Sequence, residues 1–267
     1  MLIGAIIQAR CNSTRLPNKV LLPLPSSAKT TVLDHIVSSL KSSKKIQTFV
    51  VATSDQPSDD VIAETFPNNV FRGDEENVLS RYCICAKEHN MDVVVRLTGD
   101  NPCIDIACLD AAVDAHIERK HDYSRITGLP LGLNAAIMSR AALEQAHSQA
   151  KDPYELEHVT PYIQRRPEEF SIGTFQVETD ESVRNLRLTM DYPSDYALMN
   201  LLFPYLDNKP VTIANISAFL DVYPWATEIN PNYQKTDYAS IEDEVQAAKT
   251  VLKKLEMHRA AAALKVD

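Results

Sequence analysis

The sequence predicts an α/β fold in which a mostly parallel, mixed sheet carries helices on both faces. Three apolar, branched segments have the length of buried strands: Leu2–Ile7, Phe49–Thr53 and Val93–Leu97. Each is followed by a polar stretch and then by apolar residues at helical spacing. Strands that alternate with helices are typical of parallel sheets, because a parallel pair needs a long crossover connection.

Further elements continue this alternation, more loosely after Tyr123. Short strands are predicted at Val70–Arg72, Ala135–Ser139, Phe170–Val177 and Asn185–Met190. Helices are predicted at Thr31–Lys41, from Ser58, around Val78–Ala86, and at Asp105–Arg119, Arg140–Ala150, Tyr154–Arg165 and Tyr196–Leu206. An Ala-, Lys- and Glu-rich helix is expected from Ser240. The predicted organisation is a domain of residues 1–206 and a helical C-terminal extension of residues 207–267.

The composition excludes several classes of protein. A net charge of -9 argues against nucleic acid as a partner, because such proteins need a broad basic face. No apolar run approaches the roughly 20 residues of a membrane-spanning helix. The N-terminus leads directly into a strand without the features of a signal peptide, and five cysteines suggest no disulfide framework. We therefore expect a cytoplasmic protein with no nucleic-acid or membrane partner.

The loop after the first strand has the composition of a phosphate-binding loop. It holds three cations and two short hydroxyl donors: Arg10, Arg15, Lys19, Ser13 and Thr14. Like charges on one short loop repel one another unless an anion lies among them, and guanidinium forks suit a polyphosphate. The alternative is a solvated basic loop, which the acidic character of the whole chain disfavours. Neither a dinucleotide fingerprint nor a Walker loop is present.

A second landmark is Thr98–Pro102 (TGDNP), directly after the strand Val93–Leu97. A carboxylate at the carboxyl end of a strand, here Asp100, suits a Mg²⁺ ion that bridges phosphate oxygens. The same residues also form a good turn, so local sequence leaves both interpretations open. The cationic loop nearby favours the metal.

The loop resembles the signature of cytidylyltransferases that activate acidic sugars, above all the spore-coat polysaccharide (SpsF-like) branch. That pattern is QAR-x-x-STRLP-x-KVL, and this chain matches it at Gln8, Ala9, Arg10, Ser13, Thr14, Arg15, Leu16, Pro17, Lys19, Val20 and Leu21. Three further stretches match the branch: Phe71–Gly73 (FRG), Thr98–Pro102 and Glu157–Ile163 (EHVTPYI). The resemblance covers Leu2 to about Leu206 and implies a Rossmann-like nucleotidyltransferase fold.

The resemblance implies transfer of CMP from CTP to an acidic sugar, with release of pyrophosphate. Arg10, Arg15 and Lys19 would be the catalytic cations that hold the phosphates. The implied nucleotide-binding residues are Ala9, Arg10, Ser13, Thr14, Arg15, Lys19, Ser54, Asp55, Arg72, Asn77 and Thr98. Asn77 and Arg81 would face the nucleotide, although an exposed helical face explains both equally well.

The resemblance also implies a metal site and an acceptor site. Asp100 and Asp191 would hold Mg²⁺, the expected cofactor. His158 and Tyr162, one helical turn apart, would face the sugar acid. Local alternatives stay open: Asp191 can cap the helix that follows it, and a single histidine is more often structural than functional.

The loop departs from many relatives, which carry glycines where this chain has Cys11–Asn12 and Asn18. Asn tolerates the left-handed backbone conformation better than most residues, so the loop geometry is expected to survive. Arg10 and Arg15 would lower the pKa of the Cys11 thiol and make it prone to oxidation.

Two other functions compete with CMP transfer. A nucleotide-sugar-dependent glycosyltransferase shares the fold type but needs an Asp-x-Asp metal motif, which TGDNP is not. A catalytically silent nucleotide-binding homologue is the other, since Gly132–Ala136 reads GLNAA where relatives carry GLDVE. The expected partners are CTP and a sugar acid, and a homodimer is left open.

Overall fold

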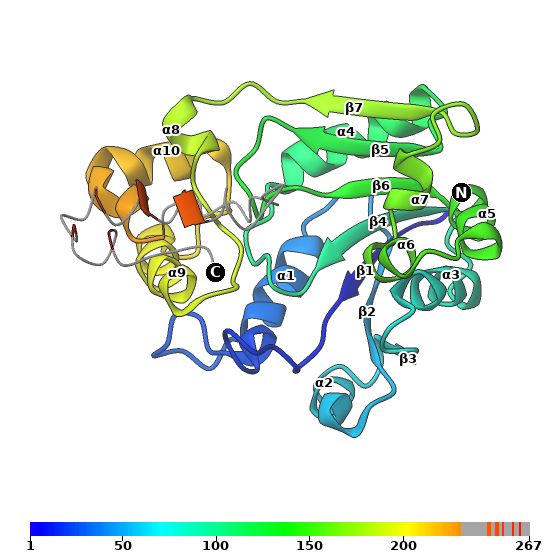
Figure 1. Cartoon of the computed structure of the whole chain (residues 1–267), viewed down its shortest axis with the longest axis horizontal. Coiled ribbons are helices and arrows are strands. Elements are labelled where there is room, and N and C mark those ends of the chain that lie inside the picture. Colours follow the sequence, from blue (N-terminus) through cyan, green and yellow to red (C-terminus); the bar gives the residue numbers. More distant parts are fainter. Residues whose placement is uncertain (231–244, 247–248, 251–252, 254–257, 259–261, 263–267) are drawn as a thin grey trace. The chain divides into compact units, whose positions relative to one another are not determined.

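A seven-stranded sheet forms the centre of the fold, with the strand order β3-β2-β1-β4-β6-β5-β7 (Figure 1). The computed structural model describes residues 1–230 and positions 245–246, 249–250, 253, 258 and 262. The strands are β1 (Ile3–Gln8), β2 (Thr48–Ser54), β3 (Val70–Gly73), β4 (Val93–Thr98), β5 (Tyr123–Thr127), β6 (Ala136–Ser139) and β7 (Ile172–Gln176). Only β6 runs antiparallel to its neighbours, and the other pairs are parallel. The predicted mostly parallel, mixed sheet is confirmed.

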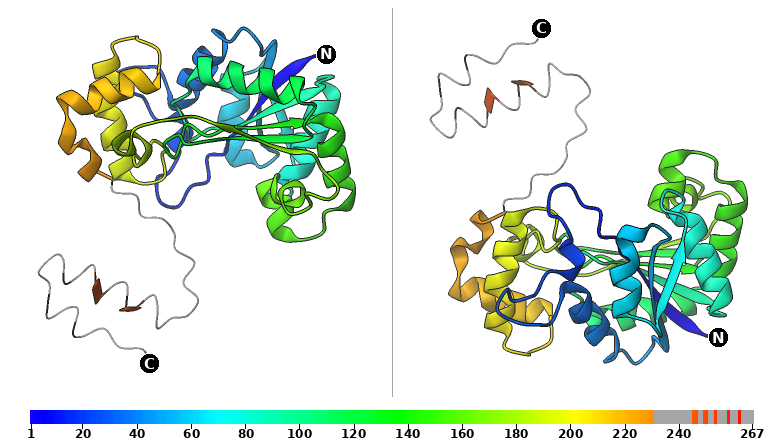
Figure 2. Two further views of the ribbon diagram at one scale, coloured as in Figure 1. Left: turned by 90° about the horizontal axis from the view of Figure 1, so that it is seen from above. Right: turned by 90° about the horizontal axis from the view of Figure 1, so that it is seen from below.

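Helices lie on both faces of this sheet, as the alternating pattern predicts (Figure 2). The α-helices are α1 (Val32–Leu40), α2 (Asp60–Thr65), α3 (Val78–Glu88), α4 (Ile106–Glu118), α5 (Arg140–Gln149), α6 (Pro153–His158), α7 (Pro161–Gln164), α8 (Glu181–Arg184), α9 (Pro193–Leu206) and α10 (Ile213–Val222). Short 3-10 helices occupy η1 (Lys19–Leu21), η2 (Pro57–Asp59) and η3 (Pro224–Glu228).

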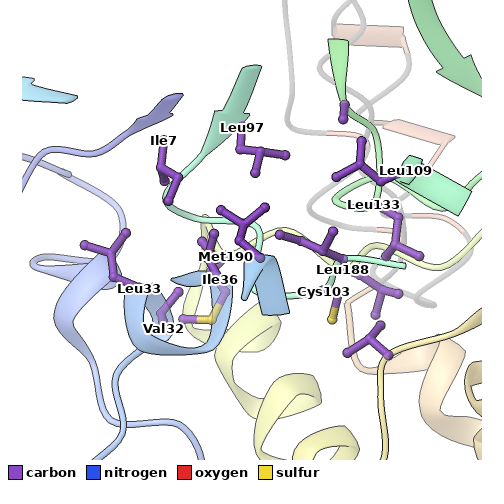
Figure 3. Close-up of a cluster of buried hydrophobic side chains, with 14 of the residues drawn as sticks. Ile7, Val32, Leu33, Ile36, Leu97, Cys103, Leu109, Leu133, Leu188 and Met190 are labelled. Carbon is purple, nitrogen blue, oxygen red and sulfur yellow. The ribbon is translucent and has the colours of Figure 1, made fainter. Parts of the chain in front are cut away.

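Side chains alternate along the central strands, so each face of the sheet has its own core. On one face, Ile3, Ala5 and Ile7 of β1 pack with α1, α4 and α9 in a large buried cluster, part of which Figure 3 shows. On the other face, Ile6 packs with buried residues of α3 and α5. Gln8, two residues after Ile6 at the end of β1, therefore directs its side chain to the α3 face.

Helix α1 shows how local signals define an element. The Thr31 side chain accepts a hydrogen bond from the Asp34 N–H, and the Asp34 carboxylate accepts one from the Thr31 N–H, which makes a capping box. The apolar residues at helical spacing are all buried: Val32, Leu33, Ile36, Val37 and Leu40. Burying each large side chain contributes about 1.5–3 kcal/mol, and this face therefore fixes the helix on the sheet.

The predicted helix Tyr154–Arg165 is interrupted and forms the two short helices α6 and α7. Val159 adopts a left-handed backbone conformation with φ 70°, which ends α6. Pro161 opens α7, and it has no N–H to bond to a preceding turn. His158 and Tyr162 therefore do not share one helical face.

The predicted strand Asn185–Met190 is wrong, and strand β5 was not predicted. Within the described residues, the segment forms a single isolated bridge, between Arg187 and Leu131, because its neighbour is a loop. Strand β5 has only five residues and exposes Arg125 within them, which hides the alternation that marks a strand. Propensity alone does not determine such short elements.

The chain beyond Leu206 continues to pack as part of the same compact unit, which spans Met1–Pro231. Ile216, Phe219 and Leu220 of α10 are buried in the core that α1, α4 and α9 share. The expected domain boundary after Leu206 therefore falls inside this unit. Most of the helix expected from Ser240 lies outside the described residues. None of the described helices has the length and apolar character needed to cross a membrane.

The sheet reverses its direction of winding between β1 and β4, which lie side by side (Figure 1). Ligands of open α/β sheets bind at the carboxyl ends of the strands at such a point. The loops after the two strands meet there, where the Gly99 N–H donates to the Gln8 carbonyl at 2.7 Å. A Cβ on Gly99 would lie 2.9 Å from the Ala9 Cβ and 3.1 Å from the Gln8 carbonyl oxygen.

Gly99→Ala is expected to lower the free energy of unfolding by about 1–3 kcal/mol, because the added methyl group forces the two loops apart. Thermal unfolding of the variant measures the loss. Gly73→Ala is the matched control, since its Cβ would meet only side-chain atoms, none closer than 3.1 Å. Equal stability of the two variants would contradict the close approach.

Candidate active site

A cleft of about 360 Å³ opens at the carboxyl ends of β1 and β4. Four segments line it: the loop after β1, the loop after β4, one face of α3, and the end of α6, together with Asp191. The lining residues are Gln8, Ala9, Arg10, Asn12, Ser13, Thr14, Arg15, Lys19, Val20, Val78, Arg81, Thr98, Gly99, Asp100, Glu157, His158 and Asp191. The cleft therefore combines a strongly cationic loop with two aspartates from distant parts of the chain.

Lys19 lies between the two aspartates. Its Nζ is 2.6 Å from Asp100 Oδ2 and 2.8 Å from Asp191 Oδ1, so the two carboxylates converge on one point. Burial alone would lower the pKa of Lys19, but the two carboxylates outweigh it and raise the pKa. The side chain is therefore a fully charged ammonium that neutralises a pair of like charges.

Asp191 is held in place from its other side by residues of its own segment. Its Oδ2 accepts a hydrogen bond from Arg187 Nη2, at 2.5 Å, and its backbone N–H donates to Asp195 Oδ2 at 2.8 Å. Burial would raise the pKa of Asp191, but the cations of Lys19, Arg15 and Arg187 hold it below its usual value. Asp191 is thus an ionised carboxylate that faces the cleft.

Asp195, and not Asp191, caps the helix that follows. Its fully buried carboxylate accepts the N–H groups of Asp191 and Tyr192 at the start of α9. Arg187 Nε and Asn230 Nδ2 donate to its other oxygen, at 3.0 and 2.9 Å. The cap interpretation of Asp191 is therefore wrong. The spacing Arg187–Asp191–Asp195, four residues apart, is the sequence signal that was missed.

Arg15 closes the cationic side of the cleft and remains about half exposed. Its Nη1 donates to the Tyr192 hydroxyl at 2.9 Å, and its guanidinium carbon lies 4.7 Å from the centre of the Tyr192 ring. A longer contact of 3.3 Å joins Nη2 to Asp191 Oδ1. These interactions orient the guanidinium while leaving it accessible to a ligand.

The loop keeps its shape without the glycines of many relatives. Asn18 adopts the left-handed conformation at φ 53°, as its tolerance for this region predicts. The buried carboxylate of Asp59 accepts the Cys11 N–H at 2.7 Å and also the Ser54 hydroxyl. Asp59 therefore anchors the start of the loop to the end of β2, a role that its position near a helix start does not reveal.

The expectation for Cys11 is wrong. The side chain is buried, and burial together with the nearby Asp59 carboxylate raises its pKa to about 11. The arginines of the loop point elsewhere, toward the cleft that Arg10 and Arg15 line. The thiol is therefore protonated near neutral pH and shielded from oxidants.

Cys11 is expected to react with iodoacetamide at pH 8 about 100-fold or more slowly than a free cysteine, because so little of it is thiolate. Peptide mass spectrometry over a time course measures the rate. The same peptide in the urea-unfolded chain provides the reference, and equal rates in the two states would contradict a buried thiol.

Most predicted nucleotide-binding residues line the cleft, but four do not: Ser54, Asp55, Arg72 and Asn77. Ala9, Arg10, Ser13, Thr14, Arg15, Lys19 and Thr98 line it. Ser54 bonds to Asp59, and Arg72 donates to the carbonyl groups of Ser54 and Gln56 and pairs with Asp60 at 2.6 Å. Arg72 therefore holds the turn after β2. Asp55, which directly follows β2, also lies outside the cleft lining.

Asn77 has a structural role at the start of α3. Its side chain accepts the Ser80 N–H at 2.9 Å and so caps the helix. It also lines a second hollow next to the cleft, which Arg10 and Glu157 border from the cleft side. Arg81, on the same helix, is only 3% exposed, so an exposed helical face does not explain it.

The two residues predicted to face the sugar acid lie in different surroundings. His158 lines the cleft and packs edge-on against Tyr154, with 4.3 Å between ring centres. Tyr162 is buried, and its hydroxyl donates to Gln149 at 2.5 Å, away from the cleft lining. The break at Val159 between α6 and α7 turns the two side chains apart.

The unusual GLNAA stretch lies away from the cleft lining. Gly132 adopts φ 106° and packs so tightly on Leu188 that a Cβ would lie 2.3 Å from its carbonyl carbon. Asn134 borders a very small cavity elsewhere, and Ala136 begins β6 beside Arg96 of β4. Gly132 therefore supports the segment that carries Asp191, and the altered residues Asn134 and Ala136 lie outside the cleft lining.

Comparison with known proteins now identifies the family. The family model described as "Cytidylyltransferase" matches residues 4–252. The chain belongs to the cytidylyltransferase family. The spore coat polysaccharide biosynthesis protein SpsF of Bacillus subtilis is 36% identical over 212 residues, 77% of this chain and 88% of that protein. An uncharacterised protein of Methanocaldococcus jannaschii is 38% identical over 248 residues, 91% of this chain and 100% of the other.

Solved structures agree with this assignment. A cytidylyltransferase of Leptospira borgpetersenii is 32% identical, with a TM-score of 0.79, and the match covers 88% of this chain and 100% of that one. A CMP-2-keto-3-deoxy-manno-octonic acid synthetase solved with CTP is 14% identical, with a TM-score of 0.60 over 76% of this chain and 99% of that one, so it supports the fold alone. This cytidylyltransferase is thus a nucleotidyltransferase enzyme of Rossmann-like fold, in the SpsF-like branch.

Proposed function

We propose that this enzyme transfers CMP from CTP to a hydroxyl group of an acidic sugar and releases pyrophosphate, for the synthesis of a surface polysaccharide or glycan. The observation that supports this proposal is the meeting of a cationic loop with Asp100 and Asp191 across one cleft. The named role of SpsF in polysaccharide synthesis agrees with it. Membership of the family disfavours the glycosyltransferase alternative.

The reaction needs little covalent chemistry from the protein. The sugar hydroxyl attacks the α-phosphorus in line with the departing pyrophosphate, so orientation and charge neutralisation supply most of the catalysis. Arg10, Arg15 and Lys19 would bind the β- and γ-phosphates and stabilise the leaving pyrophosphate. Ser13 and Thr14, which line the cleft between them, offer hydroxyl donors to the same oxygens.

The residues present fit a magnesium ion. Mg²⁺ is usually held by one or two carboxylates, with phosphate oxygens and waters completing six ligands. Asp100 and Asp191 supply two convergent carboxylates, and no larger group of metal-binding side chains occurs in the described part of the chain. The ion, when bound with CTP, would withdraw charge from the phosphate oxygens. Asp195 and Arg187 would keep Asp191 oriented toward it.

His158 is the proposed contact for the sugar acid. It lines the cleft at the end of α6, together with the loop that would hold the phosphates. Arg10 and Glu157 border the same part of the cleft and extend into the neighbouring hollow, so they offer both signs of charge to a polyhydroxylated acid. Tyr162, buried against Gln149, would only support this region.

The experiment that tests the proposal is a pyrophosphate-release screen of CTP, UTP, ATP and GTP with Mg²⁺ against a panel of sugar acids. We expect turnover with CTP and at least one sugar acid. We also expect CTP to raise the melting temperature most, because stabilisation reaches about 2.7 kcal/mol when a ligand is at one hundred times its Kd. Greater stabilisation by another nucleotide would contradict the choice of CTP.

Lys19 occupies the point on which both carboxylates converge, so metal and ammonium would compete for it. Lys19→Met is therefore expected to bind Mn²⁺ about tenfold or more tightly than the unaltered protein in the absence of nucleotide. The intensity of free Mn²⁺ in electron paramagnetic resonance measures the binding directly.

The control for this experiment is Lys45→Met, which removes an exposed ion pair with Asp114 outside the cleft lining. Its affinity for Mn²⁺ should stay at the level of the unaltered protein. Weaker or unchanged metal binding by Lys19→Met would show that the two carboxylates do not form the metal site.

A further inference from the structure

Two side chains that line the cleft carry polar atoms with no hydrogen-bond partner within the described residues. Arg81 of α3 is 3% exposed, and its Nε and Nη1 are both buried and unpartnered. Gln8, at the end of β1, has a buried and unpartnered Oε1. Both residues line the cleft. Because buried polar groups are nearly always paired in native proteins, these atoms mark a place that a ligand completes.

Arg81 lies where a core residue would be expected. Val78, Arg81, Tyr82 and Cys85 recur at helical spacing among the buried residues of α3. The hydroxyl of Tyr82, fully buried, donates to the carbonyl groups of Ile6 and Leu97 and so fixes the helix against β1 and β4. Arg81 is thereby held rigidly beside the ends of these two strands.

Gln8 faces the same side of the sheet as Arg81. The alternation along β1 directs Ile6 and Gln8 to the face that α3 covers, while Ile7 faces α1. The cleft is therefore lined both by guanidinium donors and by an amide oxygen that have no partner within the described residues. Ala9, Val20 and Val78 add apolar surface to the same cleft, which suits the flat face of an aromatic ring.

A phosphate group satisfies only part of this lining. Phosphate oxygens only accept hydrogen bonds, so they can pair with Arg81 and, when the Gln8 amide rotates, with its Nε2, but never with its Oε1. A ring edge that carries an amine beside ring acceptors satisfies both residues at once. We propose that Gln8 and Arg81 read the pairing edge of the cytosine of CTP, with Gln8 accepting from the exocyclic amine and Arg81 donating to the ring nitrogen and carbonyl oxygen. This inference rests on the proposed use of CTP.

The chemistry of the bases explains why Arg81 is the discriminating residue. Cytosine presents an amine donor next to two acceptors, whereas uracil presents a ring N–H between two carbonyl oxygens. The amide of Gln8 can rotate to donate to uracil. A guanidinium has only donors, so Arg81 cannot accommodate the ring N–H of uracil. A site built for hydrogen bonds rejects a base that leaves them unmade.

The test measures the affinities of CTP, UTP and inorganic tripolyphosphate by titration calorimetry with Mg²⁺. Arg81→Gln should lower the ratio of CTP to UTP affinity about 10- to 100-fold, because its amide can pair with either base. Gln8→Leu should weaken CTP binding about tenfold. Neither change should alter the affinity for tripolyphosphate. Gln8→Leu keeps the test decisive if Arg81→Gln folds poorly.

Lys87→Gln is the matched control, since it removes an exposed cation from the same helix outside the cleft lining. Parallel loss of CTP, UTP and tripolyphosphate affinity in Arg81→Gln would overturn the proposal in favour of a phosphate contact. An unchanged ratio of CTP to UTP would overturn it in favour of a structural role. Selective CTP binding without pyrophosphate release from any sugar acid would support the base reading and refute only the proposed activity.

Discussion

The Lys19 ammonium contacts two carboxylates that are distant in the chain: Asp100, 81 positions later, and Asp191, 172 positions later. Two carboxylates that converge on one point repel each other strongly, and only a cation between them makes their approach favourable. Arg187 neutralises Asp191 from behind, and Asp195 fixes its backbone. The loops after β1 and β4 and the segment before α9 therefore depend on one another for their charge balance.

Much of this arrangement could be predicted from the sequence, because it follows from strand ends and residue types. The cationic loop and Asp100 each follow a buried strand, and parallel strands bring their carboxyl ends to one edge. What could not be predicted depends on rotations and partners that local patterns do not encode. Tyr162 turns away because Val159 breaks the helix, and Arg72 is engaged by carbonyl groups of a neighbouring turn.

The same limit explains the error at Cys11. Sequence neighbours suggested that Arg10 and Arg15 would stabilise a thiolate, yet the side chain packs into the core beside the Asp59 carboxylate. Charge along the chain is a weak guide to charge in space, since a single peptide unit can direct adjacent side chains to opposite sides. Arg81 is the converse case, because a cation within an apolar stripe conflicts with helix patterning. Such conflicts tend to mark functional positions.

The reversed direction of β6 has a consequence for how this enzyme can diverge. Because β6 runs antiparallel to β4, the connection from β5 to β6, residues 128–135, returns to the same edge of the sheet as the cleft. There the Leu131 carbonyl accepts the Leu188 N–H at 2.7 Å, and Gly132 packs against Leu188, three residues before Asp191. Insertions or deletions in this connection would therefore shift Asp191, which the ion pair with Lys19 ties to the cationic loop. The length of a connection outside the cleft lining is in this way constrained by the charge pairs inside the cleft.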